Sequence, residues 1–214
     1  MERRTVLKNI GLSFGAITLT PTVASLIQSC QSGETVAASF LNTQQAGLVG
    51  KIIDVILPTT ANVPGALDLN LLQFIDGYID KVSSKEEQDF VRMAVDTFGE
   101  YAKNKASKKS VGELTNEDID VQLNQFLRAS SEVQDTRSNS YNLYEEELLA
   151  GNTPSIPVDG VCHEFLKAIH KLVIFAFQGN EIIAKEHMVY VPVPGQQKGC
   201  VDLEEATGGK AWAL

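Results

Sequence analysis

Between Val161 and Phe177 the chain carries its most strongly apolar segment outside the first thirty residues. Phenylalanine, leucine, isoleucine and valine leave little polar face on a helix of this sequence, so such a helix needs neighbours on most sides. The segment is too short for a membrane-spanning helix, and its first half carries charged residues. Gly179 follows as a residue that commonly ends helices. The segment therefore predicts a central helix that other helices surround.

Four other segments combine helical spacing of apolar residues with a helix-start signal. In two of them the start residue and the residue three positions later have the spacing of a capping box, namely Ser84 with Glu87 and Thr115 with Asp118. The breaker pair Pro64-Gly65 separates the first two segments. The expected starts are Thr43, Asp68, Ser84 and Thr115.

The remaining sequence shows weaker patterns. Residues 130–142 are polar and predict no element, and residues 151–160 are expected to form a loop because prolines interrupt them. A short helix is expected near residues 180–187, and from about residue 188 glycine and proline predict a non-helical tail. With no repeat and no strand pattern, we predict a mostly α fold: a single helical domain with an extended, irregular C-terminal arm.

The first residues are typical of an export signal rather than of a folded domain. Arg3 and Arg4 form a basic head, a mildly apolar run follows from residue 10 to 27, and the small residue Ser29 ends it. Paired arginines followed by Val-Leu-Lys indicate the twin-arginine route, which carries proteins across a membrane already folded. The alternative is an uncleaved N-terminal anchor. The expected location is periplasmic.

Cys30 has the setting of a lipoprotein cysteine, with an aliphatic residue nearby and a small residue directly before it. Lipidation there would attach the exported protein to the membrane. The alternative is that Cys30 is only a small apolar residue near the end of the leader. We expect an export signal over residues 1–29, a flexible tether over 30–42 and a helical domain over 43–214.

The chain is acidic, with a formal charge of −9 at pH 7, and the leader itself is basic. An acidic surface repels phosphate backbones, so a nucleic-acid partner is not expected. One basic cluster remains, and it is interpreted as a solvated helix end or, alternatively, as a docking patch. The cluster consists of Lys103, Lys105, Lys108 and Lys109.

Residue types that carry chemistry are sparse. The sequence holds no dinucleotide fingerprint, no Walker loop and no CxxCH haem motif. His163 and His170 lie seven positions apart, where they could act as metal ligands or, alternatively, as core or interface histidines held by hydrogen bonds. Cys162 and Cys200 could pair with each other, pair with a partner or stay free. These patterns predict no catalytic, cofactor or metal site within the chain.

Besides the twin-arginine leader, the chain contains a set of short motifs: Ile56–Thr60, Pro64–Ala66, Phe74-Ile75, Val191–Gly195, Gly199–Val201 and Gly209–Trp212. Together these motifs resemble those of gluconate 2-dehydrogenase subunit 3 proteins. The resemblance spans nearly the whole chain after the leader, and its most distinctive parts are the Pro-Gly turn and the tail. Asp202 and Asn62 depart from the family tendency, which is proline and an acidic residue at these positions.

The resemblance implies a non-catalytic small subunit. Its partners would be a large flavin-dependent dehydrogenase of the glucose-methanol-choline type, which holds FAD, and a cytochrome c subunit, which holds haem. The small subunit would support the folded export, stability and membrane attachment of the large one. The alternative is a free-standing helical envelope lipoprotein that acts as a binding module. The expected partner-interface residues are Phe177, Tyr190, Cys200 and Trp212, and the alternative for the three aromatic residues is packing within the chain.

Overall fold

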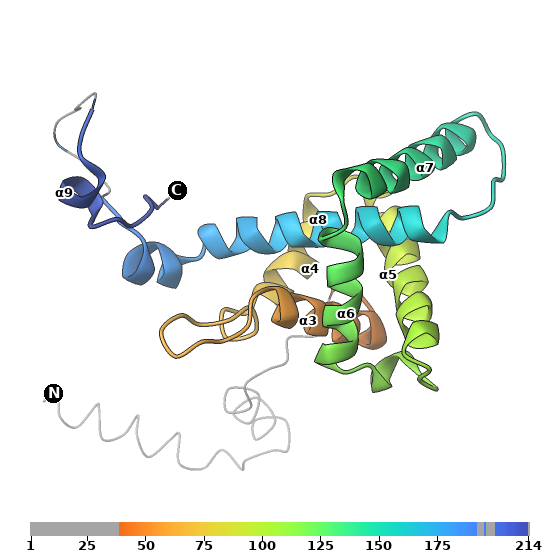
Figure 1. Ribbon diagram of the computed structural model, residues 1–214, viewed down its shortest axis with the longest axis horizontal. Coiled ribbons are helices and arrows are strands. Elements are labelled where there is room, and N and C mark those ends of the chain that lie inside the picture. The colour runs from red at the N-terminus through yellow and green to blue at the C-terminus, as the bar shows by residue number, and fades with distance from the viewer. Residues whose placement is uncertain (1–38, 192–194, 196–199, 214) are drawn as a thin grey trace, which may run out of the picture. The chain divides into compact units, whose positions relative to one another are not determined.

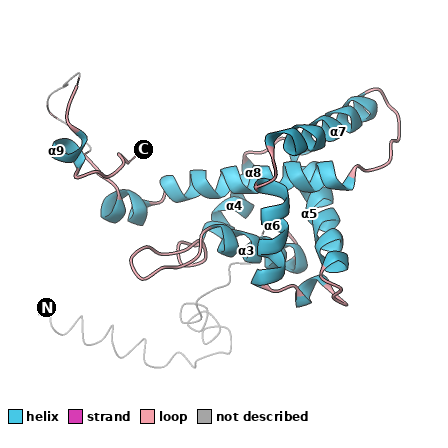
Figure 2. Ribbon diagram, viewed as in Figure 1, coloured by secondary structure: helices cyan, strands magenta, loops and turns pink. Residues whose placement is uncertain are grey.

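The computed structural model describes residues 39–191, 195 and 200–213 (Figure 1). Helices make up most of this part of the chain, and its β structure is one isolated bridge between Val189 and Trp212 (Figure 2). The prediction of a mostly α single domain is confirmed. The helices are α3 (Thr43–Ile56), α4 (Leu71–Lys81), α5 (Lys85–Lys105), η1 (Val111–Glu113), α6 (Asn116–Leu127), α7 (Ser131–Leu149), α8 (Val158–Gln178), η2 (Ile183–His187) and α9 (Leu203–Thr207).

Helix α8 is the centre of the domain, as its apolar sequence predicts. It contacts each of the helices from α3 to α7, which Figure 1 shows arranged along it. Phe165, Leu166 and Val173 are completely buried on α8, and Gly179 is its C-cap. Covering a helix on several sides removes most of its apolar surface from water, and this burial is the main stabilising contribution to the fold.

Helix starts follow the capping signals of the sequence. Ser84 opens α5: its side chain accepts the backbone N–H of Glu87 at 3.2 Å, and Glu87 accepts the N–H of Ser84 at 2.8 Å. Thr115 and Asp118 form the second expected capping box, at the start of α6. Helix α3 has a third box, in which the N-cap is Asn42 rather than the expected Thr43.

Helix α7 lies where the sequence predicts no element. None of its residues is fully buried, so it has no apolar stripe from which it could be recognised. It is held on the domain by side chains at its edge: the Arg137 guanidinium lies 4.6 Å from the Phe126 ring centroid, and the rings of Tyr141 and Phe90 are 5.1 Å apart.

Gly160 lies in α8, although residues 151–160 were expected to form a loop. A Cβ atom at this position would lie 2.5 Å from the Ser140 hydroxyl and 2.9 Å from the Arg137 carbonyl oxygen of α7. Only a glycine lets the two helices come this close. A glycine shortly after two prolines is typical of a loop, and the role of Gly160 depends on helix α7, which the sequence pattern did not reveal.

The domain begins before α3, because Phe40 and Leu41 are buried. Both residues lie near the end of the segment 30–42, which was predicted to be a flexible tether. This end of the segment is instead part of the folded domain. The reason is Asp76 on α4, which is itself 3% exposed and accepts backbone N–H groups from residues 39 to 41. The Arg92 guanidinium covers the Phe40 ring at 4.2 Å. Residues 30–38 of the predicted tether lie outside the described part.

The C-terminal arm is closed at its base by the bridge between Val189 and Trp212. The N–H of Val189 donates to the Ala211 carbonyl at 2.9 Å, and the N–H of Ala213 donates to the Val189 carbonyl at 3.0 Å. The arm also contains helix α9, which the expectation of a non-helical tail missed. Asp202 is the N-cap of α9 and accepts the N–H of Glu205 at 3.1 Å, so this departure from the family tendency has a local structural role.

Candidate functional site

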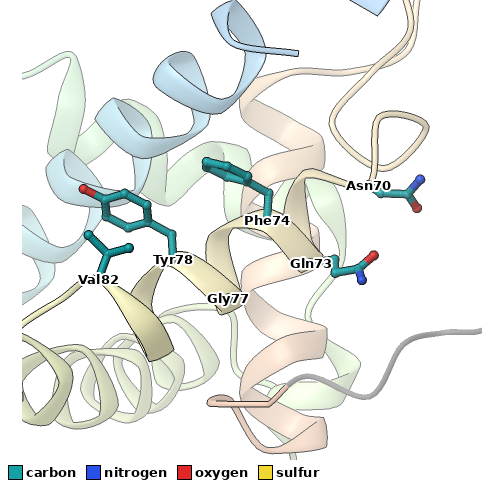
Figure 3. A pocket seen from close by; sticks show the side chains of 6 residues that line it. All are labelled: Asn70, Gln73, Phe74, Gly77, Tyr78 and Val82. Carbon is teal, nitrogen blue, oxygen red and sulfur yellow. The ribbon is translucent and has the colours of Figure 1, made fainter. Parts of the chain in front are cut away.

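An open depression of about 490 Å³ lies on the outer face of α4 (Figure 3). We call it the α4 groove. No charged residue lines it, whereas the chain as a whole is strongly acidic. Figure 3 shows Phe74 and Tyr78 pointing toward the same side of α4, with Val82 beside Tyr78. The groove is lined by Asn70, Gln73, Phe74, Gly77, Tyr78 and Val82.

Two residues that line the α4 groove, Phe74 and Tyr78, belong to an aromatic cluster. Phe74 and Tyr78 lie one helical turn apart on α4, and Phe175 reaches them from α8, with ring centroids 6.1 to 6.2 Å apart for all three pairs. Phe74 and Phe175 are nevertheless 44% and 52% exposed. Contiguous exposed aromatic surface is typical of an interaction site. The sequence shows that α4 has a broad apolar face, but it does not show which part of that face stays uncovered.

The loop before α4 has a fixed conformation. A Cβ atom at Gly65 would lie 2.4 Å from the Thr59 backbone nitrogen, so only glycine fits there. The Asp68 carboxylate accepts the Thr59 hydroxyl and the Gly65 N–H, the latter at 3.0 Å. The hydrogen bond from Thr59 is the main cause that lowers the pKa of Asp68, and the hydrogen bond from Gly65 lowers it further. The Pro64-Gly65 turn therefore sets where α4 begins.

Asn70, at the rim of the α4 groove, has an unusual backbone. Its φ of 54° lies in the left-handed region, which asparagine tolerates better than most residues. Asn70 is the N-cap of α4, but its side chain makes no capping hydrogen bond. In Figure 3 the amide points away from Phe74 and Tyr78, which leaves its donor and acceptor atoms at the surface beside the groove.

Two of the four expected interface residues come together in the arm. Tyr190 follows Val189 of the bridge, Trp212 is the other bridge residue, and each side chain is 50% exposed. Cys200 is exposed in the same arm, and its thiol is free. Phe177 differs from these three, because it is only partly exposed and packs against the core.

Cys162 is buried in α8 and is not bonded to Cys200. Burial raises the pKa of the Cys162 thiol to about 12, and the nearby Asp159 carboxylate adds to this rise. The thiol is therefore protonated at neutral pH, and a protonated thiol is a poor nucleophile.

The two α8 histidines have different surroundings. His163 is 1% exposed, and its Nδ1 lies 3.2 Å from the Phe126 carbonyl oxygen, as expected of a histidine held in the core by a hydrogen bond. Desolvation by burial is the main cause that lowers the pKa of His163. His170 is exposed. Across the described ranges, no group of three or more histidine, cysteine, aspartate or glutamate side chains is placed to hold a metal ion.

Some predictions concern residues that the structure does not describe. Arg3, Arg4 and Cys30 lie outside the described residues, so the export signal and the lipidation site remain predictions. In the part of the chain that is described, no helix has the length and apolar character needed to span a membrane. The basic cluster is described, and in it Lys103 pairs with Glu100 while Lys108 lies 3.3 Å from Asp118.

Comparison with known proteins adds one match. Residues 43–195 match the model of the family described as gluconate 2-dehydrogenase subunit 3, and this range is more than half of the 214-residue chain. It includes α3 to η2 and therefore the whole α4 groove. No curated protein and no solved structure matches the chain.

Proposed function

The chain belongs to the gluconate 2-dehydrogenase subunit 3 family, and we propose that it acts as the non-catalytic small subunit of a flavin-dependent dehydrogenase complex. The match over residues 43–195 is the observation that carries this proposal. The large subunit would be an FAD-dependent enzyme of the glucose-methanol-choline type that oxidises a sugar or polyol. FAD would be held by that subunit, and haem by a cytochrome c subunit that accepts its electrons.

Exposed aromatic side chains support a binding role. Phe74 in the α4 groove, Phe175 beside it on α8, and Tyr190 and Trp212 in the arm are each about half exposed. Aromatic residues carry a large share of the binding energy in protein interfaces, because they bury much apolar area with few rotatable bonds. We assign Tyr190, Cys200 and Trp212 to the surface that contacts the large subunit. Phe177 packs against the core and supports this surface from within the domain.

The leader supports a role in export. A flavoprotein folds around its cofactor before it crosses a membrane, and the twin-arginine route accepts folded proteins. If the large subunit lacks a leader of its own, a bound small subunit with Arg3 and Arg4 carries both across. A lipid on Cys30 then keeps the complex at the periplasmic face of the membrane.

Gene deletion tests this function. Removal of the small subunit from a cell that expresses the complex is expected to leave the large subunit in the cytoplasm, with little dehydrogenase activity in the periplasm. Re-expression of the full chain is the control and should restore both. If the large subunit is exported and fully active without the small subunit, the proposed function is wrong, and the chain acts as a free-standing lipoprotein.

A further inference from the structure

The described chain enters the domain between α4 and α5. The hydroxyl of Ser39 donates to Asp76 at 3.0 Å and lies 3.3 Å from Asp80, and both carboxylates belong to α4. From the other side, the Arg92 guanidinium of α5 covers the ring of Phe40 at 4.2 Å. Because Phe40 and Asp76 are both buried, this entry point is a fixed part of the domain.

The length of chain before the entry point limits how far the domain can lie from a lipid on Cys30. Nine positions separate Cys30 from Ser39, and nine residues reach at most about 32 Å, whatever their conformation. A compact domain of this size has a radius of gyration of about 15 Å and is therefore about 40 Å across. Since the reach is shorter than this diameter, a lipid on Cys30 keeps the side of the domain that contains Ser39 toward the membrane.

The two helices beside the entry point differ in the charge of their exposed surfaces. On α5, the first turn exposes Glu86 and Glu87, and Asp89 follows. On α4, all six residues that line the α4 groove are uncharged, and at its edge Lys81 is paired with Asp80 at 2.5 Å. A charged group loses hydration when it leaves water, whereas an uncharged surface avoids this cost. Of these two surfaces, only the α4 groove suits contact with lipid.

The side chains of the α4 groove also suit the boundary between lipid and water. Phe74 is 44% exposed and Val82 is 63% exposed, and Figure 3 shows them on the same side of α4 as Tyr78. Exposed apolar surface of this kind is typical of protein or membrane contacts, and tyrosine is enriched at membrane interfaces. Gly77 of the groove directly follows Asp76, so this surface lies next to the residue that holds the entry point.

We propose that the α4 groove contacts the surface of the membrane to which Cys30 attaches the chain. This inference rests on the lipid anchor of the proposed function and adds the contacting surface and the orientation of the domain. Phe74, Tyr78 and Val82 enter the headgroup region, while the acidic start of α5 stays in water. A few apolar side chains bind lipid only weakly by themselves, so the groove orients the domain and the anchor holds it.

Quenching of a fluorescent label by lipid tests this orientation. The lipidated chain carries Cys200→Ser, so that a thiol-reactive label attaches only at Gln73→Cys, and it is reconstituted into phosphatidylcholine vesicles that contain nitroxide-labelled phosphatidylcholine. The label at position 73 is expected to lose most of its fluorescence. Val121→Cys is the matched control, because Val121 is 60% exposed on α6, which packs on α3 and α8. A label there should keep most of its fluorescence.

A second pair of variants separates contact with lipid from mere proximity to it. Phe74→Glu places a carboxylate in the α4 groove and should reduce the quenching at position 73, since a charged group stays in water. Val121→Glu places the same charge on α6 and should leave that quenching unchanged. Both variants keep Cys30 and its lipid, and thermal melting checks that each is folded.

The outcomes separate this inference from the proposed function. If the protein floats with the vesicles and position 73 is quenched no more than position 121, the groove contact is wrong and the proposed function stands. If mass spectrometry finds no lipid on Cys30, both the membrane attachment and this inference are wrong, whereas binding of the large subunit is judged by co-purification.

Two further results would assign the α4 groove to another occupant and overturn the inference. In the first, the label at position 73 is already shielded from water before vesicles are added, which would indicate another segment of this chain. In the second, quenching at position 73 disappears when the purified large subunit is added, which would indicate that subunit.

Discussion

The carboxylate of Asp76 on α4 accepts the backbone N–H of Leu41 at 2.8 Å, and it lies 3.2 Å from the N–H of Phe40. The N–H and the hydroxyl of Ser39 also donate to this carboxylate. One buried side chain thus satisfies three successive amides from a segment more than thirty positions away. Because hydrogen bonds to an ionised group are stronger than neutral ones, Asp76 fixes where the described chain enters the core.

Asp76→Asn should destabilise the domain by about 2–3 kcal/mol, because the amide group turns donors toward backbone N–H groups and leaves some of them unsatisfied. Urea denaturation followed by circular dichroism measures the free energy of unfolding. Asp89→Asn is the control: Asp89 is an exposed partner of Lys85, so its loss should change stability by less than about 0.5 kcal/mol. Equal stability of the two variants would contradict the role given to Asp76.

Gly160→Ala should lower the free energy of unfolding by about 1–3 kcal/mol, because the new methyl group must push α7 away from α8. The contact with the Arg137 carbonyl is a backbone contact and cannot be relieved by rotating a side chain. Gly47→Ala should act in the opposite direction, stabilising α3 by up to about 1 kcal/mol, since alanine favours helix and its Cβ meets nothing there. A Gly160→Ala protein as stable as the unaltered one would show that the two helices are not tightly packed.

The parts of the fold that the sequence predicts are those with a local signal. The box at Ser84 and the apolar segment around Phe165 each depend on residues within one helix, and the structure confirms both. Helix α7 has no such signal, because its contacts are made by polar and aromatic residues such as Arg137 and Tyr141. Asp76 was missed for a related reason: its partners lie more than thirty positions away in the sequence.

The candidate site could be predicted only in part. Tyr190 and Trp212 stand out as aromatic residues in a tail rich in glycine and proline, and the structure places both at the surface. Phe74 and Phe175 look like core residues in the sequence, since each lies among apolar residues at helical spacing. Which apolar residues remain exposed depends on how far α8 covers α4, and that is a property of the packed fold.

The two described cysteines should differ in reactivity. In a Cys30→Ser protein treated with iodoacetamide at pH 8, Cys200 should be alkylated within minutes and Cys162 should not, since burial raises the pKa of Cys162 to about 12. Both should react once the protein is unfolded in urea, which is the control. Mass spectrometry of the digested protein reads the sites. Alkylation of Cys162 in the folded protein, or a disulfide between the two, would contradict the structure.

The free energy of unfolding should fall as the pH drops below 6.5, and protonation of His163 in the unfolded chain should account for part of this fall. Burial keeps the pKa of His163 below its ordinary value of 6.5, so the unfolded chain takes up a proton at a higher pH than the folded one. The contribution of the neutral side chain is present above pH 6.5 and is lost as the pH falls below it, with a slope of at most about 1.4 kcal/mol per pH unit. His163→Gln should lose that part of the slope even if the variant is less stable overall. If urea denaturation at several pH values gives the same dependence of the free energy of unfolding on pH for the variant and the unaltered protein, His163 is not the source of that dependence.

Substitution of Arg3 and Arg4 by lysine should leave both subunits in the cytoplasm, because the twin-arginine route requires the arginine pair and carries folded proteins. Cell fractionation and immunoblotting of both subunits measure the distribution. A Cys30→Ser variant is the informative comparison: it should still export both subunits but release them from the membrane. If the lysine variant retains only the small subunit, joint export is wrong.

The central claim is that this chain is one subunit of a flavoprotein complex, and native mass spectrometry tests it most directly. The tagged chain is expressed together with a glucose-methanol-choline-type dehydrogenase from the same genome, purified through the tag and measured intact. The expected spectrum contains one species whose mass equals the sum of both subunits and one FAD. Recovery of the small subunit alone, with no flavin and no large subunit, would contradict its role as a subunit of a flavoprotein complex.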